Sequence, residues 1–164
     1  IDLPPVIQLR QKLIGNKKNV HAIACSVWDF DWINHIAKDT PLLIVIEGLL
    51  LYFEEADVKR LFLSLIDRLP SFQITFDSIS QTTLEQEQRS ATYLDFTKTP
   101  YRWGINDIQE IEEWHPSILV EQELYPFEHF GQRCPANIKE LLENQPMAER
   151  MNRIALIQRK TSTI

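Results

Sequence analysis

LLIVIEGLLLYFEE, residues 42–55, is the stretch that decides the fold. Its first five residues, 42–46, are apolar without a break, and they stand between Pro41 and the pair Glu47-Gly48. A continuous apolar run of this length predicts a strand buried on both faces, as in a parallel sheet that helices cover. Ligands of open α/β sheets bind outside the carboxyl ends of such strands. Glu47 stands at that end and is the first candidate site residue.

Strand and helix patterns alternate on both sides of this stretch. Apolar runs predict the end of a strand at Ile1-Asp2 and further strands over 20–27, 73–76, 117–125 and 153–159. Helical patterns follow at 4–14, 30–37, 54–69, 105–114 and, broken by a proline, at 136–151. The order predicts one α/β domain over 1–164, with a mostly parallel, doubly wound sheet and an antiparallel edge formed by the last two strands.

Composition places the chain among ordinary globular proteins. It has 164 residues, 44% of them hydrophobic and 24% charged, which is enough to bury a core. The net charge of −6 argues mildly against a nucleic-acid partner. No apolar run approaches the roughly 20 residues of a membrane span, and no signal peptide opens the chain. With two cysteines and no disulfide framework, we expect a cytoplasmic protein without a membrane partner.

The positions of the glycines and histidines argue against the common nucleotide-binding motifs and against a zinc site. The chain has four glycines, and no two of them form a Gly-x-Gly turn. A dinucleotide fingerprint and a P-loop are therefore both excluded, so any nucleotide cradle is incomplete or built differently. The four histidines are dispersed at 21, 35, 115 and 129, and no spacing typical of a zinc site occurs. We expect no metal.

An acid stands at the end of each candidate parallel strand: Asp2, Asp29, Glu47 and Asp77. Four carboxylates at one sheet edge suit ribose hydroxyls, an adenine amino group, an ammonium group or a metal ion. The alternative is that each acid caps the helix that follows, and this reading is strongest for Asp29. Glu47 is followed by Gly-Leu-Leu rather than by a helix start, which favours a ligand site.

Four segments carry a family resemblance in order and spacing. They are IDLPPVIQLRQKL, IACSVWDFDW, IEGLLLYFEEADVKRLF and FDSIS, and the later WGIND and EEW agree with them. Together they resemble the leucine carboxyl methyltransferase-like family, in particular its bacterial O-methyltransferases similar to those of polyketide synthesis. The resemblance covers nearly the whole chain. The pairing of IDLP with EGLLLYF is its most specific part.

The resemblance implies a class I fold, a Rossmann-like doubly wound sheet, with S-adenosylmethionine as cofactor. By position in the motifs, Asp2 matches the acid that binds the ribose hydroxyls, and Asp29 with Phe30 matches the pair at the adenine. Glu47 matches the glutamate beside the methionine moiety, and Tyr52 is near enough to shape the same pocket. The reaction implied is methyl transfer to the hydroxyl or carboxyl group of a small molecule.

The methyl acceptor has weaker signals. Residues 81–114 are expected to form a lid or an acceptor pocket, with Phe96, Tyr101, Trp103 and Trp114 as lining aromatics. These aromatics are equally typical of a core. Asp77 matches a family position without a defined role. Because methyl transfer from a sulfonium is an in-line displacement that needs alignment rather than a covalent nucleophile, no catalytic residue is assigned.

The chain departs from the family at its start, where the first strand and its glycine-rich turn are missing. A sheet without that central strand would expose apolar edges. We therefore expect the C-terminal part of a longer protein, or a second chain that completes the sheet as a homodimer or by strand exchange. This chain alone should bind S-adenosylmethionine poorly.

The alternative function is a non-catalytic module that acts through dimerisation or partner binding. A nicotinamide-dependent oxidoreductase is disfavoured because Glu47-Gly48 and Asp29-Phe30 match the methyltransferase pattern.

Overall fold

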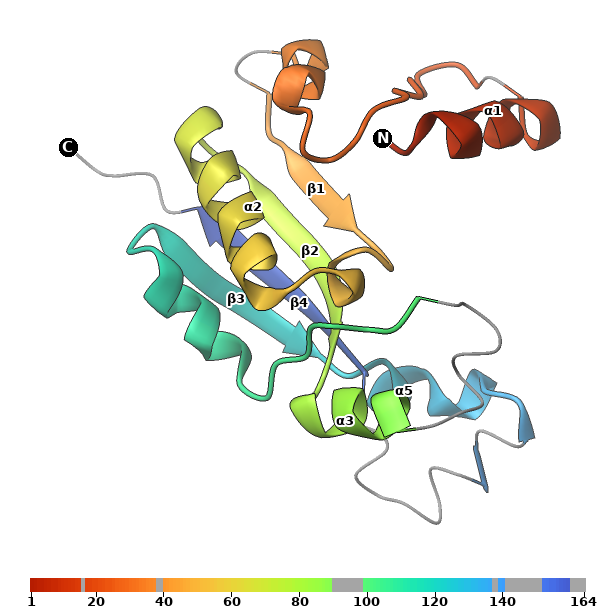
Figure 1. Cartoon of the computed structure of the whole chain (residues 1–164), viewed down its shortest axis with the longest axis vertical. Helices are drawn as coiled ribbons and strands as arrows, with labels where there is room; N and C mark the ends of the chain where they lie inside the picture. Colours follow the sequence, from red (N-terminus) through yellow and green to blue (C-terminus); the bar gives the residue numbers. More distant parts are fainter. Residues whose placement is uncertain (16, 38–39, 90–98, 137–138, 141–151, 160–164) are drawn as a thin grey trace. The chain divides into compact units, whose positions relative to one another are not determined.

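The chain divides into two compact units, Ile1–Thr40 and Pro41–Ile164, in this computed structural model. The structure describes every residue except 16, 38–39, 90–98, 137–138, 141–151 and 160–164 (Figure 1). Most of the broken helix predicted over 136–151 lies outside the described residues, as does Phe96. None of the described helices combines the length and the apolar character that crossing a membrane requires.

Unit 1 contains the two helices that its sequence predicts. Helix α1, Pro4–Leu13, begins at a Pro-Pro pair, which suits a first turn whose N–H groups have no partner within the helix. Gly15 follows it in the left-handed region, with φ +70°, as helix ends commonly require. The 3-10 helix η1, Phe30–His35, follows Asp29, and the Asp29 carboxylate accepts a bond of 3.4 Å from the Asp31 N–H.

The strand predicted over 20–27 is wrong. Within the described part of unit 1, this segment makes only an isolated parallel bridge, between Asp2 and Ala24. The Asp2 N–H donates to the Ile23 carbonyl at 3.2 Å, and the Cys25 N–H donates to the Asp2 carbonyl at 3.0 Å. A ladder cannot continue along this pair because α1 begins at Pro4, where the chain turns helical and the N–H is missing.

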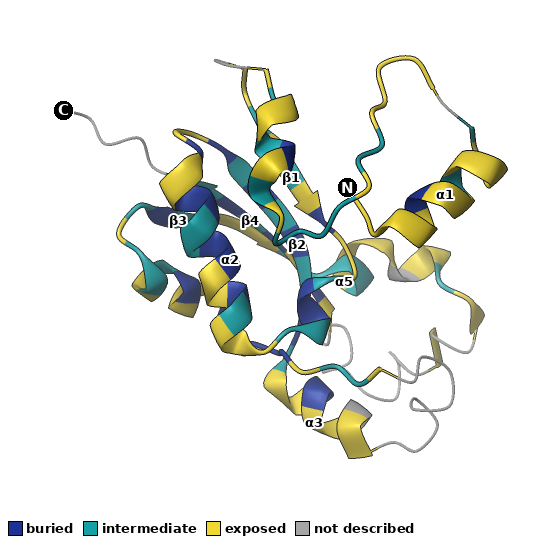
Figure 2. Cartoon of the chain, turned by 45° about the horizontal axis from the view of Figure 1, so that its top comes forward, coloured by how far each residue is buried: buried dark blue, intermediate teal, exposed yellow. Residues whose placement is uncertain are grey.

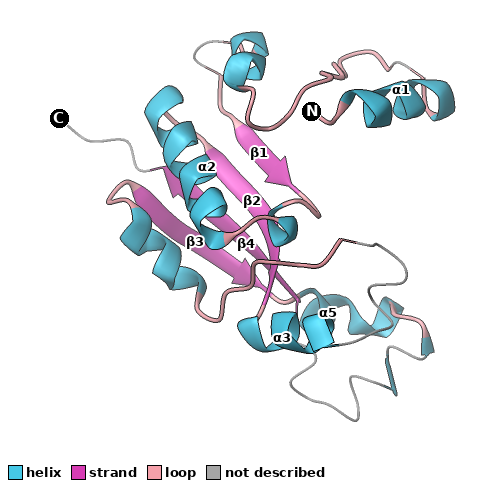
Figure 3. Cartoon of the chain, in the orientation of Figure 1, coloured by secondary structure: helices cyan, strands magenta, loops and turns pink. Residues whose placement is uncertain are grey.

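Unit 2 is built on a four-stranded sheet of order β1-β2-β4-β3 (Figure 3). Its strands are β1 Leu43–Ile46, β2 Gln73–Ile79, β3 Ile118–Leu124 and β4 Asn152–Arg159. β1 and β2 are parallel, and β4 is antiparallel to both β2 and β3. The α/β class and the antiparallel pairing of the last two strands are confirmed. The antiparallel strand itself, however, lies inside the sheet rather than at its edge.

One face of this sheet is covered by helices. Helix α2, Glu55–Arg68, agrees with its predicted range and turns its apolar stripe inward, so that Phe62 meets Phe76 of β2 with ring centroids 5.5 Å apart. Trp114, at the end of the 3-10 helix η3, Ile108–Trp114, packs against the same phenylalanine at 5.7 Å. Figure 2 shows the buried residues concentrated in α2 and the central strands. The remaining helices are η2 Leu50–Tyr52, α3 Gln81–Arg89, α5 Pro126–Phe130 and η4 Gly131–Arg133.

Strand β1 is not buried on both faces, as its apolar run predicted. Leu43 and Val45 are 55% and 65% exposed, whereas Ile46 is 7% exposed. Side chains alternate along a strand, so Leu43 and Val45 share the face opposite Ile46. β1 is also an edge strand of the described sheet, where its one paired neighbour is β2. The apolar run therefore predicted the strand correctly but not the burial of this face.

Candidate functional site

The motif glutamate lies on a turn at the carboxyl end of β1. The β1–β2 ladder ends at the pair Ile46 and Phe76, and the exposed Glu47 follows. Gly48 then adopts φ +60°, a left-handed conformation that glycine takes without steric cost. Its N–H donates to Oδ1 of Asp77 at 2.8 Å. The Glu47–Gly48 turn is therefore held by a side chain from the neighbouring strand.

Asp77 is positioned differently from its sequence prediction. The strand predicted to end at Phe76 continues as β2 to Ile79, and Asp77 pairs with Ile154 of β4. Asp77 therefore projects from within β2, one step beyond the point where β1 leaves the ladder. Asp77 had no predicted role, and the structure places it in contact with the turn that carries Glu47.

Two tyrosines meet at the same end of the sheet. The rings of Tyr52, at the end of η2, and Tyr101 lie 5.3 Å apart in an edge-on arrangement. Burial raises the pKa of the Tyr52 phenol, and Tyr101 and then the charge of Asp77 raise it further. The Tyr52 hydroxyl is therefore protonated in neutral solution, where it is a hydrogen-bond donor and not a base.

The segment that carries Tyr101 is fixed by its backbone. The N–H groups of Arg102 and Trp103 both donate to the Leu51 carbonyl, at 2.7 and 3.3 Å. The Ile105 N–H donates to the Ile79 carbonyl at 2.8 Å. Gly104 permits this close approach, since a Cβ there would lie 2.9 Å from the Ser80 carbonyl oxygen. Residues 101–105 are thus bound to η2 and to the end of β2.

Arg153 of β4 secures the same segment and was missed by the sequence analysis. It is 4% exposed, and its Nη1 and Nη2 donate to the carbonyls of Ile105 and Asn106 at 3.0 and 2.8 Å. Its Nε forms an ion pair with Glu123 of β3 without an aligned hydrogen bond. The available signal was an arginine directly before a continuous apolar run, because an arginine that such a strand buries requires partners.

Three of the four aromatics predicted for the acceptor pocket are described by the structure, and they occupy different surroundings. Trp103 is 2% exposed, and its ring lies 6.2 Å from that of Phe76, within the core. Trp114 packs on Phe62. Tyr101 is half-buried beside Tyr52, and of these three described aromatics it is the one that lies next to another candidate site residue.

The remaining candidate residues belong to unit 1. Asp2 is exposed, and its carboxylate accepts a bond of 2.8 Å from the Leu3 N–H. Asp29 is exposed and caps η1, as the capping interpretation predicted, and Phe30 is half-buried. Within unit 2 the structure brings together Glu47, Tyr52, Asp77 and Tyr101.

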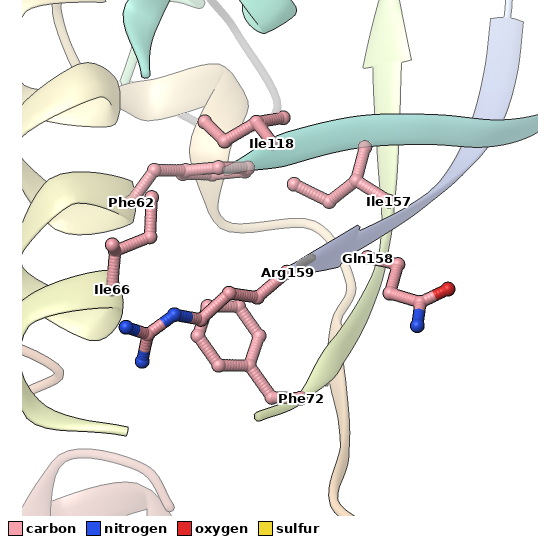
Figure 4. Close-up of a pocket in the computed structure, with 7 residues that line it drawn as sticks. All are labelled: Phe62, Ile66, Phe72, Ile118, Ile157, Gln158 and Arg159. Carbon is pink, nitrogen blue, oxygen red and sulfur yellow. The ribbon is translucent and has the colours of Figure 1, made fainter. Parts of the chain in front are cut away.

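A small hollow lies at the opposite end of the sheet (Figure 4). It lies where β2 and β3 begin and β4 ends, and it is too narrow to hold a water molecule. Its lining residues are Phe62, Ile66, Phe72, Ile118, Ile157, Gln158 and Arg159. Ligands of α/β sheets bind at the carboxyl ends of the strands, so this hollow is on the wrong side for the candidate site. Among the described residues, no group of three or more His, Cys, Asp or Glu side chains is placed to hold a metal ion.

No protein-family model matches the chain. In sequence it is similar to the tetracenomycin polyketide synthesis O-methyltransferase TcmP of Streptomyces glaucescens, with 30% identity over 123 residues. The match covers 75% of this chain and 45% of that protein. The chain therefore spans less than half of the relative's length.

Solved structures agree with the sequence match. A DUF574 family protein from Streptomyces avermitilis has a TM-score of 0.60 at 16% identity, with 97% of this chain and 63% of that chain covered. A candidate methyltransferase from Thermobifida fusca has a TM-score of 0.63 at 19% identity, covering 98% and 62%. The plantazolicin methyltransferase BpumL, solved in complex with SAH, has a TM-score of 0.51 at 13% identity, covering 96% and 63%. These likenesses show the fold over the part that the chain spans.

Proposed function

We propose that this chain, a relative of polyketide-type O-methyltransferases in the leucine carboxyl methyltransferase-like family, is part of an S-adenosylmethionine-dependent O-methyltransferase. The whole protein would methylate a hydroxyl or carboxyl group of a small molecule. The observation that carries the proposal is the exposed Glu47 on a glycine turn at the carboxyl end of a parallel strand. It is supported by the match to TcmP and by the SAH complex of BpumL.

Each candidate residue has a role that suits its chemistry. Glu47 would face the ammonium of the methionine end, because an exposed carboxylate attracts a cation at short range. Asp2 would accept bonds from the ribose diol, as carboxylates do in dinucleotide sites. Asp29 and Phe30 would contact the adenine, and Tyr52 would form a wall of the cofactor pocket.

The described residues fit S-adenosylmethionine in part. The carboxylates of Asp2, Asp29 and Glu47 are exposed and therefore accessible to a ligand. The Gly-x-Gly turn that would cradle the methionyl group does not occur among the four glycines of the sequence. The matched relative is also more than twice as long as the match, which covers 45% of it. We therefore propose that this chain alone binds the cofactor poorly, and that further residues or a second copy complete the site.

The chemistry follows from alignment. When bound, S-adenosylmethionine supplies an electrophilic methyl group on a sulfonium. The chain's own residues would hold the donor and acceptor in line and exclude water, and proximity of this kind is worth roughly 7–11 kcal/mol. The protonated Tyr52 phenol would donate a hydrogen bond rather than take a proton. A carboxylate acceptor needs no base, whereas a hydroxyl acceptor must lose its proton.

The acceptor would be a small molecule on the side of Tyr101, since that segment lies across the end of β2. A BpumL structure with a triazolic desmethylPZN analog and SAH supports a small-molecule acceptor for this fold. A screen of hydroxyl and carboxyl acceptors with labelled S-adenosylmethionine on the whole protein would identify its class.

A second candidate function is a non-catalytic module that acts through dimerisation or partner binding. The observation that favours it is the exposed apolar face of β1, formed by Leu43 and Val45. In solution this function would appear as a stable dimer of the chain that neither binds nor uses the cofactor. Sedimentation analysis together with the binding experiment below separates it from the enzyme.

Two measurements test the proposed function. Calorimetric titration of this chain with S-adenosylhomocysteine should show weak binding or none, and micromolar binding would contradict the incomplete site. In the whole protein, Glu47→Gln should lower cofactor affinity by about 10- to 100-fold, because hydrogen bonds to charged groups contribute about 1.5–3 kcal/mol. The matched variant is Glu110→Gln, which alters an exposed glutamate of η3. Equal affinities for the two variants would remove Glu47 from the site.

A further inference from the structure

The hydrogen-bonded pairing of β1 with β2 ends where the candidate site begins. The last pair of the β1–β2 ladder is Ile46 with Phe76, and the chain of β1 turns away at Gly48 with φ +60°. β2 continues to Ile79 and is paired on its other side with β4 through this whole stretch. The backbone of Asp77 is therefore anchored by β4, whereas the Glu47–Gly48 turn has no ladder bond to β2.

One side-chain contact replaces the missing ladder. Oδ1 of Asp77 accepts from the Gly48 N–H at 2.8 Å, across 29 residues of sequence. That length is typical of a hydrogen bond strengthened by a charged partner. Asp77 lies on the same face of β2 as Gln73 and Thr75, because side chains two positions apart in a strand point to the same side. The partners of Gln73 and Thr75 in β1 are Leu43 and Val45. It therefore reaches the turn from the face of the sheet opposite the one that α2 covers.

We infer that Asp77 is a positioning residue for the cofactor site. Its carboxylate sets the conformation of the Glu47–Gly48 turn and so fixes where Glu47 presents its own carboxylate. The inference rests on the proposed function for the ligand of Glu47, but the contact itself belongs to the free chain. The two acids at this end of the sheet then have different roles. Glu47 contacts the ligand, and Asp77 acts on Glu47 through the Gly48 backbone.

The test is nuclear magnetic resonance on the labelled chain without any ligand. In the wild type, a scalar coupling across the hydrogen bond should link the Gly48 amide nitrogen to the Asp77 side-chain carboxyl carbon. Asp77→Ala should speed hydrogen exchange of the Gly48 amide by about tenfold or more, as expected for losing a bond to a charged acceptor. It should also shift the resonances of Glu47.

Matched variants separate positioning from general loss of structure. Asp77→Asn keeps an acceptor oxygen at the same place and should restore most of the protection of the Gly48 amide. Thr75→Ala changes a half-buried residue on the same face of β2, two positions earlier, and should leave the Gly48 amide unchanged.

The inference is overturned if the coupling is absent in the wild type, or if Asp77→Ala leaves Gly48 exchange and the Glu47 resonances as they were. It is also overturned if Asp77→Asn behaves like Asp77→Ala. Should Asp77→Ala not fold, the wild-type coupling and the Asp77→Asn spectrum decide. Failure here is distinguishable from failure of the proposed function, because no cofactor enters this experiment.

Discussion

The two ends of the sheet in unit 2 are held by different forces. At the carboxyl end, polar contacts join residues far apart in sequence: Gly48 with Asp77 across 29 residues, and Arg153 with Ile105 across 48. At the amino end, the hollow in Figure 4 is lined mostly by apolar side chains such as Phe62 and Phe72. The difference indicates that the amino end contributes mainly stability, whereas polar contacts at the carboxyl end hold the candidate site residues in place.

The first prediction concerns Phe62→Ala, a truncation of an apolar side chain at the amino end. If it disturbed the Glu47–Gly48 turn, the two ends of the sheet would not have separate roles. Phe62 is buried between the rings of Phe76 and Trp114. The cavity left behind should lower the free energy of unfolding by about 3–5 kcal/mol. Urea denaturation measures the loss, and the Gly48 amide spectrum should stay close to wild type. The control is Phe130→Ala, at a ring that is 49% exposed, and a similar loss there would contradict the assignment.

The second prediction asks whether a polar contact at the carboxyl end also contributes to stability. Arg153→Lys keeps the charge but loses the planar fork that reaches the Ile105 and Asn106 carbonyls together. A buried carbonyl left without its donor costs about 1–3 kcal/mol, which should appear in the free energy of unfolding. Arg159→Lys, at the hollow of the amino end, is the matched control. If both variants unfold alike, Arg153 does not secure the segment 101–105.

The third prediction concerns the conformation of the turn. Gly48→Ala places a Cβ on a residue with φ +60°, where left-handed geometry costs roughly 1–2 kcal/mol. No atom lies within 4 Å of the added carbon, so the cost is conformational rather than steric. Gly48→Asn should cost less, because asparagine tolerates this region. Urea denaturation compares the two, and equal costs would count against a left-handed turn in solution.

The smallest effect is expected at alkaline pH. Burial raises the pKa of Tyr52 and also that of Tyr125, which follows β3. The unfolded tyrosines ionise first, near pH 10. The folded state's preference for the protonated phenols therefore adds its full stability below that pH, and this stability is lost as the pH rises through the folded pKa. The unfolding free energy should therefore fall above about pH 10. Tyr52→Phe should show a shallower decline, and an identical decline would mean that Tyr52 ionises as it does in the unfolded chain.

Local patterns predicted most of the elements of unit 2. The 3/4 spacing of Val58, Leu61, Phe62 and Leu65 gave α2 to within a residue, because each helical turn places its own apolar residues on one face. The antiparallel pair β3–β4 was also predicted and is confirmed. The strand over 20–27 and the second buried face of β1 were wrong. Both depend on which neighbours the sheet provides, and an apolar run does not specify them.

The site divides in the same way. Glu47 was predicted as a site residue from its place after an apolar run, and Tyr52 from its distance to that glutamate in the motif, and both stay predictions. The contact of Asp77 with Gly48 was not found, nor was the contact of Arg153 with Ile105. Each joins segments whose separation in sequence carries no signal, and each depends on a strand register that is set only when the sheet forms.

The sequence by itself therefore determined helices α1, η1, α2 and η3, the apolar runs of the four strands and the family resemblance that implies a cofactor. All of these follow from residue type and short-range spacing, which are local properties. Tertiary structure decided that β4 lies inside the sheet, that Asp77 holds the Glu47–Gly48 turn and that a buried arginine secures the segment beside Tyr101. These contacts arise because strand pairing brings together groups that are distant along the chain, and their hydrogen bonds form only once the strands are in register.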